Sequence, residues 1–214
     1  SGAGKSSLAK AIAAELHILY VDTGAIYRTI GCYARRKGVE TADTEAVIAL
    51  LPEVEIGMLY DAQGLQHMLL HGEDVTEEIR LPEMSLYASA VSAIPEVRAF
   101  LLEMQRDFAR KSSVIMDGRD IGTVVLPHAD VKIFLKADVE VRARRREIEL
   151  QERGTPRPYE QVLEEMRQRD YNDTHRSAAP LRAAEDAVIV DTSDLDFRQS
   201  KEKLLEIIRE KVGL

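Results

Sequence analysis

The chain contains a single cysteine, Cys32, among its 214 residues. One cysteine excludes a disulfide within the chain and fits a reducing compartment. No uninterrupted apolar run approaches membrane-spanning length, and no basic-then-apolar leader is present. The formal net charge of -8 argues against sequence-independent binding to a nucleic acid backbone. We therefore expect a cytoplasmic protein whose partners include neither membrane nor nucleic acid.

Several familiar signatures of catalysis and binding are also missing. The sequence shows no histidine-based triad, no HExxH zinc motif and no Asn-Lys-x-Asp guanine-reading motif. His67 and His71 are four residues apart, but they lie in a strand-like stretch, where that spacing does not make neighbouring side chains of a metal pair. We expect both histidines to be ordinary surface or packing residues.

What the sequence does contain is an alternation of short apolar runs with helical patterns. Apolar spacing predicts helices over about 5–16, 24–38, 83–93, 95–111, 138–154 and 159–173, with a last helix ending at Gly213. Buried strands are predicted at 17–22, 113–117, 131–137 and 187–193. Two further runs, 53–60 and 65–72, are separated by the turn residues "DAQG" and predict an antiparallel hairpin. The alternation predicts an α/β fold, with a parallel sheet covered by helices on both faces, in a single domain over residues 1–214.

The chain opens with "SGAGKSS", which matches the end of a phosphate-binding loop. In such a loop, backbone N–H groups converge on phosphate oxygens, Lys5 bridges the outer phosphates, and the Ser6 hydroxyl can join the shell of a Mg²⁺ ion. The alternative is a glycine-rich turn that caps an ordinary helix. The motif's first glycine and the strand that feeds it would precede Ser1. We expect roughly ten more natural residues upstream, including an apolar run, from typical strand lengths; the alternative is a truncated, inactive product.

A carboxylate follows one of the predicted strands. In "SVIMDG", Asp117 ends a buried strand, where nucleotide-binding proteins of this class place an acidic group that holds Mg²⁺ or its waters. An Asp at a strand end can also simply begin a turn. Asp117 and Ser6 are the residues that we predict as metal ligands.

Arginine is concentrated in one part of the chain. Between Arg142 and Arg182 there are ten Arg, no Lys and eight Asp or Glu. Some of these arginines must be paired on solvated helices, but exclusive use of Arg favours fork-shaped recognition of phosphate. Arg28 and Arg119 add cations near the ends of predicted strands, which converge on one crevice in a parallel sheet. If one phosphate attacks another, the nucleophile is already an anion, so cations rather than a general base are required.

These motifs resemble those of the bacterial-type cytidylate kinases, a family of P-loop nucleoside monophosphate kinases. The resemblance rests on "SGAGKSS", "DTGAIYR", "GEDVTEEIR", "VSAIPEVR", "MDGRDIGTVVLP", "VKIFLKA", "QRDYNDTHRSAAPL" and "VDTS", which occur in the family's order and spacing. It implies a P-loop three-layer core with a parallel sheet, a small antiparallel β insertion for the monophosphate over about 53–111, and a helical lid over about 148–176. It also implies transfer of a phosphoryl group from ATP to CMP or dCMP with Mg²⁺, by a monomer.

The resemblance further implies roles for individual residues. ATP would be bound by Ser1, Gly2, Ala3, Gly4, Lys5, Ser6, Ser7, Arg142 and Arg146. CMP would be bound by Thr23, Tyr27, Arg28, Ser89, Arg98, Arg119, Asp120, Arg169, Asp173 and Arg176. Within this set Ser89, Arg98 and Asp120 would read cytosine, and Arg169 and Asp173 would contact the sugar. Lys5, Arg119 and Arg176 would act in catalysis.

Alternatives remain at this level. Ser89 could be a tolerated helix serine, and Arg98 and Arg142 could be surface ion-pair partners. The activity could be that of a kinase for another acceptor, such as UMP or AMP, which would share the same core. A non-catalytic nucleotide-binding switch is a third possibility, although it would have little use for a second anion site.

Overall fold

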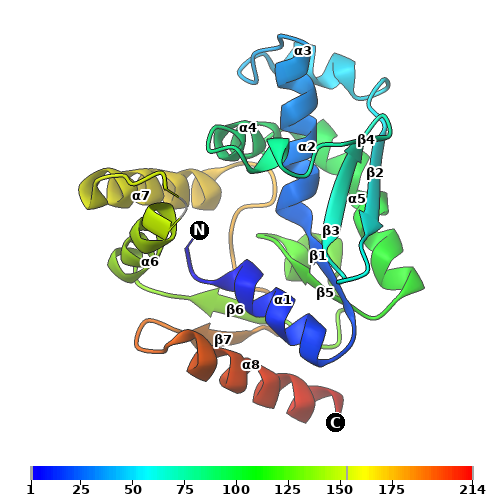
Figure 1. Ribbon diagram of the computed structural model, residues 1–214. Helices are drawn as coiled ribbons and strands as arrows, with labels where there is room; N and C mark the ends of the chain where they lie inside the picture. The colour runs from blue at the N-terminus through cyan, green and yellow to red at the C-terminus, as the bar shows by residue number, and fades with distance from the viewer. Residues whose placement is uncertain (1, 153, 214) are drawn as a thin grey trace. The chain divides into compact units, whose positions relative to one another are not determined.

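The computed structural model describes residues 2–152 and 154–213 (Figure 1). The chain divides into two compact units. Unit 1 contains the chain up to Ile12 and from Arg119 onward, and unit 2 contains Ala13–Gly118. The boundary between the units falls within the first helix and again directly after the strand that ends at Asp117.

The predicted helices and strands all occur in the predicted order, with several short elements between them. The helices are α1 (Lys5–Glu15), α2 (Thr23–Arg36), α3 (Thr44–Leu50), η1 (Glu78–Arg80), α4 (Met84–Val91), α5 (Pro95–Lys111), η2 (Ile121–Val125), α6 (Val139–Glu152), α7 (Tyr159–His175) and α8 (Phe197–Val212). The strands are β1 (Leu19–Asp22), β2 (Ile56–Tyr60), β3 (Gln66–Leu70), β4 (Glu73–Asp74), β5 (Val114–Asp117), β6 (Ile133–Lys136) and β7 (Val188–Asp191).

The strands confirm an α/β fold with parallel pairing. In unit 2, β1 pairs in parallel with β5, so that Asp22 lies opposite Asp117. In unit 1, β6 pairs in parallel with β7. The predicted hairpin is confirmed as the antiparallel pair β2–β3, and the short strand β4 adds a third, unpredicted member to its sheet.

Helix α2 is the centre of unit 2. The Asp22 carboxylate caps its N-terminus, and Arg35 and Arg36 in its last turn complement the helix dipole. Its apolar face, with Ile26 and Ile30, packs into a continuous core with residues of β3, α4 and α5. Figure 1 shows α2 (blue) passing beside β3 and α4. Much of unit 2 is therefore organised around a helix that begins where β1 ends.

One glycine allows α2 and α4 to approach each other. A Cβ on Gly31 would lie 2.7 Å from the Cβ of Tyr87, closer than side chains can pack. Next to Gly31 in sequence, Cys32 is fully buried, and burial raises the pKa of its thiol to about 12. Cys32 is therefore a packing residue of this helix, as its isolated occurrence suggests.

In unit 1, α6 and α7 pack together through a small core of their own. That core contains Ala143 and Leu150 from α6 and Val162 and Met166 from α7. The final helix α8 begins with a capping box, in which Asp196 and Gln199 bond each other's backbone N–H groups, and ends at Gly213 in the left-handed conformation.

Besides β4, three short helical elements were not predicted, namely α3, η1 and η2. Helix α3 is only seven residues long and is capped by Asp43, which accepts the N–H of Ala46. The π-helical turn η2 follows Asp120 and occupies the middle of the "MDGRDIGTVVLP" motif.

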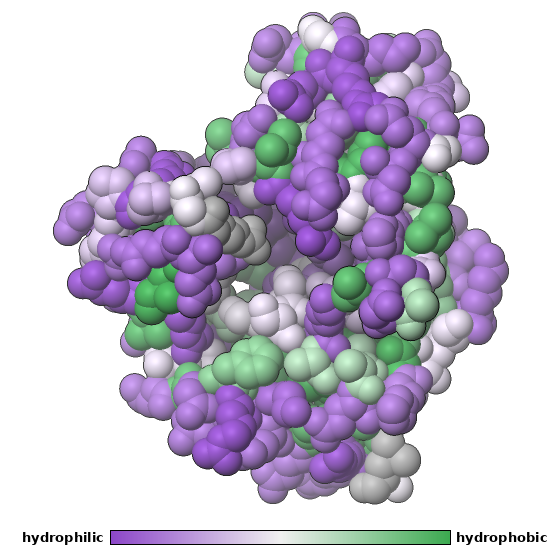
Figure 2. Space-filling view, in the orientation of Figure 1, coloured by the Kyte–Doolittle hydropathy of each residue, from purple (hydrophilic) through white to green (hydrophobic). Residues whose placement is uncertain are grey.

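Hydrophilic residues predominate on the face shown in Figure 2, with smaller hydrophobic groups between them. Within the described ranges, no helix is both long enough and apolar enough to cross a membrane.

Candidate functional site

The glycine-rich loop of unit 1 has the backbone that its sequence requires. Gly2 and Gly4 have φ of +75° and +76°, in the left-handed region that favours glycine. A Cβ on Gly2 would lie 2.8 Å from Met166 Cε and 2.9 Å from the carbonyl oxygen of Arg142. The loop therefore packs directly against α6 and α7, and it has no room for a side chain at Gly2.

Helix α1 begins immediately after this loop. Lys5, Ser6 and Ser7 form its exposed first turn, and Ala3 is half-buried. A helix N-terminus that follows a glycine-rich turn presents backbone N–H groups and a positive dipole end, which suit an anionic group. Ser1, which was predicted to bind ATP with these residues, lies outside the described residues.

The two arginines predicted to face ATP are both in ion pairs. The guanidinium of Arg142 is 3.1 Å and 2.5 Å from the two carboxylate oxygens of Asp170, and its Nε donates to the carbonyl of Ala137 at 2.9 Å. On the same helix, Arg146 pairs with Glu149 at 2.8 Å. The Arg142 pair joins α6 to α7 next to the loop, and Asp170 is a member of this site that sequence reasoning missed.

The C-terminal end of α7 collects four of the residues predicted to bind CMP. The Arg119 Nε lies 2.6 Å from the Asp173 carboxylate, whose side chain is only 4% exposed. Arg169 lies one turn before Asp173 on the same helix face. Arg176 follows as the C-cap residue, and its Nε donates to the carbonyl of Ala179 at 2.8 Å.

Asp120 is buried directly after Arg119 in the chain. Its carbonyl oxygen accepts the N–H of Val125 at 3.3 Å, the i→i+5 bond that begins η2, and also the N–H of Val124 at 2.9 Å. The π-helical turn therefore holds the backbone on the C-terminal side of Arg119 and Asp120. Single π turns of this kind occur frequently at functional sites.

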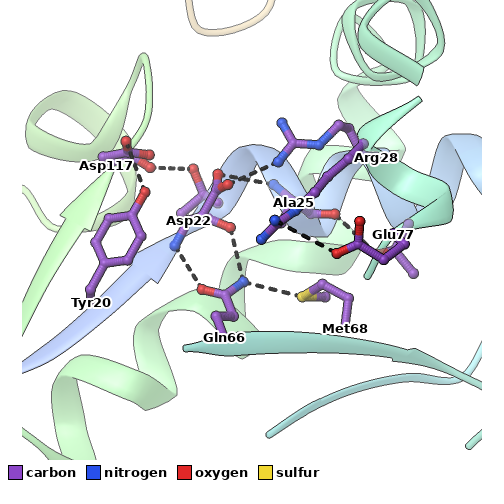
Figure 3. Close-up of polar contacts among 11 residues, drawn as sticks. Tyr20, Asp22, Ala25, Arg28, Gln66, Met68, Glu77 and Asp117 are labelled. Atoms are coloured by element: carbon purple, nitrogen blue, oxygen red, sulfur yellow. Dashed lines mark hydrogen bonds and ion pairs between the residues drawn. The ribbon is translucent and has the colours of Figure 1, made fainter. Parts of the chain in front are cut away.

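In unit 2, the candidate residues gather at the N-terminus of α2. The Thr23 hydroxyl donates to the carbonyl of Asp117 at 2.7 Å and so joins the ends of β1 and β5. The Asp117 carboxylate accepts the Tyr20 hydroxyl at 3.3 Å (Figure 3). Asp117 is buried at the end of its strand, as the sequence predicted.

Arg28 is held on the first turns of α2 by the residue that caps this helix. Its NH2 group is 2.8 Å from one oxygen of Asp22, and the other Asp22 oxygen accepts the N–H of Ala25 at 3.0 Å (Figure 3). A Cβ on Gly24 would lie 3.0 Å from Asp22 Oδ1 and 3.1 Å from Arg28 NH1. The buried Nε of Arg28 has no hydrogen-bond partner in the part of the chain that the structure describes. The guanidinium therefore keeps donor capacity beyond its ion pair.

Tyr27, Arg98 and Ser89 lie further along this unit. The Arg98 guanidinium is 5.4 Å from the centre of the Tyr27 ring, a cation–π distance, and its NH1 donates to the carbonyl of Ser92 at 3.0 Å. The Ser92 hydroxyl donates to the carbonyl of Ser89 at 3.0 Å, and Ser89 is half-buried on α4. Arg98 is thus held by α4 and α2 and is not a freely extended surface side chain.

The protein residues available to a metal ion are few. Among residues 2–152 and 154–213, no group of three or more His, Cys, Asp or Glu could hold a metal ion. Mg²⁺ commonly keeps several waters and is bound by one or two protein groups together with substrate phosphates. Of the two predicted donors, Ser6 is exposed in unit 1 and Asp117 is buried in unit 2, and their role in binding Mg²⁺ stays a prediction.

Comparison with known proteins agrees with the family resemblance of the motifs. The family model described as "Cytidylate kinase" matches residues 1–210. A cytidylate kinase of Caldicellulosiruptor saccharolyticus is 46% identical over 213 residues, which cover 100% of this chain and 94% of that protein. Cytidylate kinases of Flavobacterium johnsoniae and of a Geobacillus species are 42% and 44% identical, and each match covers 100% of this chain and 95% of the relative.

Proposed function

The chain belongs to the cytidylate kinase family, and we propose that it transfers the terminal phosphoryl group of ATP to CMP or dCMP, giving ADP and CDP or dCDP. The observation that carries this proposal is the family match over nearly the whole chain, since it includes both the loop and the arginine-bearing motifs. A kinase for another acceptor would share the core, and only its acceptor pocket would differ. A nucleotide switch is not favoured, because it would not need the arginines assigned to a second anion.

The acceptor phosphate is assigned to Arg28, Arg119 and Arg176. The unpartnered Nε of Arg28 supports this role, as does its position in the first turns of α2. The cation–π contact of Arg98 with Tyr27 supports their role in holding the base, with Ser89 and Asp120 as further polar groups for the cytosine edge. A base that left such buried groups unpaired would be rejected.

Arg169 and Asp173 are assigned to the sugar of the acceptor. A carboxylate accepts hydrogen bonds from sugar hydroxyls, and Asp173 lies on α7 in an ion pair with Arg119. Asp173 would then act twice, since it also holds the Nε of Arg119 at 2.6 Å. Phosphate groups are often bound by two parallel N–H···O bonds from one Arg guanidinium, which is the role assigned to Arg119.

ATP is assigned to the loop at Gly2–Ser7, with Lys5 on its outer phosphates and with Arg142 and Arg146 from α6. The Arg142 guanidinium would have to bind ATP while it also binds protein groups, because it already makes one bond to the Ala137 carbonyl and two to Asp170. Mg²⁺ bound with ATP would supply further positive charge for the transferring group, and Ser6 and Asp117 are the residues assigned to that ion.

In the reaction, an oxygen of the acceptor phosphate attacks the terminal phosphorus of ATP, and the bond from that phosphorus to the bridging oxygen of ADP breaks. The attacking group is an anion, so the residues need to reduce repulsion and align the two phosphates. Lys5, Arg119 and Arg176 supply that charge. Residues of about 148–176 form a lid whose closure excludes water, which would otherwise accept the phosphoryl group.

Phosphorylation of CMP, dCMP, UMP, AMP and GMP by ATP with Mg²⁺ tests the proposal. Strong turnover of CMP and dCMP over AMP and GMP is expected. Turnover of AMP or UMP in preference to CMP would mean that the reaction is phosphoryl transfer, as proposed, but that the acceptor is a different nucleotide. Binding of ATP without turnover of any acceptor would favour a nucleotide-binding switch.

A further inference from the structure

Two side chains of the inserted hairpin close on the outer edge of β1. Tyr60 and Gln66 lie opposite each other at the end of the β2–β3 pair. The Tyr60 hydroxyl donates to the carbonyl of Tyr20 at 2.9 Å. The Asp22 N–H donates to Oε1 of Gln66 at 2.8 Å, and Nε2 of Gln66 donates to the Asp22 carbonyl at 3.2 Å (Figure 3).

These contacts replace a neighbouring strand. Tyr20 and Asp22 are alternate residues of β1, so their backbone groups lie on the same edge of that strand. The primary amide of Gln66 bonds Asp22 with its oxygen and with its Nε2 group, as a peptide group of a paired strand would, and Nε2 also donates to Met68 Sδ at 3.1 Å. Burial raises the pKa of Tyr60 to about 12, so its hydroxyl stays protonated as the donor over the physiological range. The hairpin thereby fixes the position of Asp22 by its backbone.

Asp22 in turn fixes the position of the Arg28 side chain. One carboxylate oxygen caps α2 at Ala25, and the other holds the Arg28 guanidinium. The Asp22 and Arg28 side chains are each 25% exposed, so the pair is partly screened and its geometry depends on what anchors it. A continuous series of bonds therefore runs from Gln66 through the Asp22 backbone and carboxylate to Arg28.

We propose that Gln66 is a positioning residue for the acceptor phosphate, which it serves by fixing Asp22 and, through Asp22, the guanidinium of Arg28. This inference rests on the proposed function, in which Arg28 binds the phosphate of CMP. It gives the hairpin a defined role in acceptor binding through a residue that does not itself need to touch the acceptor.

The test compares steady-state kinetics of Gln66→Met with the wild-type protein. Methionine keeps the length of the side chain and removes both amide bonds to Asp22, together with the contact of Nε2 with Met68 Sδ. We expect KM for CMP to rise roughly tenfold, as the loss of one to two neutral hydrogen bonds predicts, while KM for ATP changes by less than about twofold. Gln63→Met, at the exposed turn of the same hairpin, is the matched control and should behave as wild type. Gln66→Glu is isosteric and turns the donor toward the Asp22 carbonyl into an acceptor, so it should raise KM for CMP even if the methionine variant folds poorly.

A double-mutant cycle with Arg28→Gln identifies the route. If Gln66 acts through Arg28, the double variant raises KM for CMP by clearly less than the product of the two single effects. Multiplicative effects, an unchanged KM for CMP in both Gln66 variants, or equal rises in both KM values would overturn the inference. An Arg28→Gln variant with normal KM for CMP would instead refute the role of Arg28 in the proposed function, whatever the Gln66 variants show.

Discussion

Replacement of Arg119 by Ala should lower the stability of the protein moderately and its turnover much more strongly. The change removes the cation that lies 2.6 Å from Asp173, whose side chain is 4% exposed. Breaking a fully buried ion pair costs about 3–5 kcal/mol, and a charge-assisted hydrogen bond contributes about 1.5–3 kcal/mol. Arg119 itself is 25% exposed, which reduces the cost. We expect the free energy of unfolding to fall by about 2 kcal/mol and the Tm by roughly 4–8 °C for a chain of this size.

Turnover should fall much further than stability in the same variant. A cation that stabilises a transferring phosphoryl group contributes on the order of 10²–10³ in kcat. Adding Asp173→Asn to Arg119→Ala neutralises the unpaired carboxylate, so the double variant should be more stable than the single variant by about 1 kcal/mol. Its kcat should not recover, because the lost cation is still absent.

The assays are thermal or denaturant unfolding and CMP phosphorylation at saturating ATP. Arg167→Ala is a suitable control on α7, because Arg167 pairs with Glu140 at 3.0 Å and both side chains are more than half exposed. Such a pair contributes about 0–1 kcal/mol, so stability and turnover should both be near wild type. Near-normal turnover of Arg119→Ala would refute its catalytic role. A double variant no more stable than the single variant would refute the energetic account of the ion pair.

Two shorter predictions concern unit 2. His67 lies between two aspartates, at 2.8 Å from Asp74 and 3.3 Å from Asp61, and hydrogen bonds to these carboxylates raise its pKa above the usual 6.5. The stabilisation of the folded state by protonated His67 is therefore complete below about pH 6.5 and is lost as the pH rises through the higher folded pKa. Denaturant unfolding should show that the free energy of unfolding of His67→Gln is closest to that of wild type in alkaline buffer. A difference between the two free energies that grows with pH would contradict this. Gly24→Ala should raise KM for CMP severalfold, because its Cβ would lie 3.1 Å from Arg28 NH1, while helix propensity keeps the Tm unchanged or higher. A normal KM for CMP in kinetic assays of that variant would mean that the crowding is relieved without moving the guanidinium.

Most of the regular elements could be predicted from the sequence because their signals are local. The hairpin had two strand-like runs around a turn, and α5 runs from Pro95 to Lys111, as expected from a proline at its first position. Helix α3 was missed although Asp43 is a good cap, since seven residues are too few to show helical periodicity. The π turn η2 had no sequence signal, because it depends on how the chain after Asp120 packs.

The residue types of the site could be predicted, but their pairing could not. The sequence shows ten arginines between Arg142 and Arg182 without indicating that Arg142 pairs with Asp170 or that Arg119, outside this stretch, pairs with Asp173. Such choices depend on distances between segments 28 or more residues apart. Gln66 is an extreme case, because a single polar residue in a half-buried strand has nothing in its neighbourhood that distinguishes it from a solvent-facing glutamine.

The contacts that Tyr60 and Gln66 make with β1 also bear on how this protein behaves at high concentration. A strand whose N–H and C=O groups face outward can pair with a strand of another molecule, which is a common start of aggregation. Here the carbonyl of Tyr20 and both backbone groups of Asp22 are already bonded by side chains of the same chain. The hairpin therefore protects the end of β1 against intermolecular pairing. It does so with two side chains, without adding a backbone strand beside this four-residue strand.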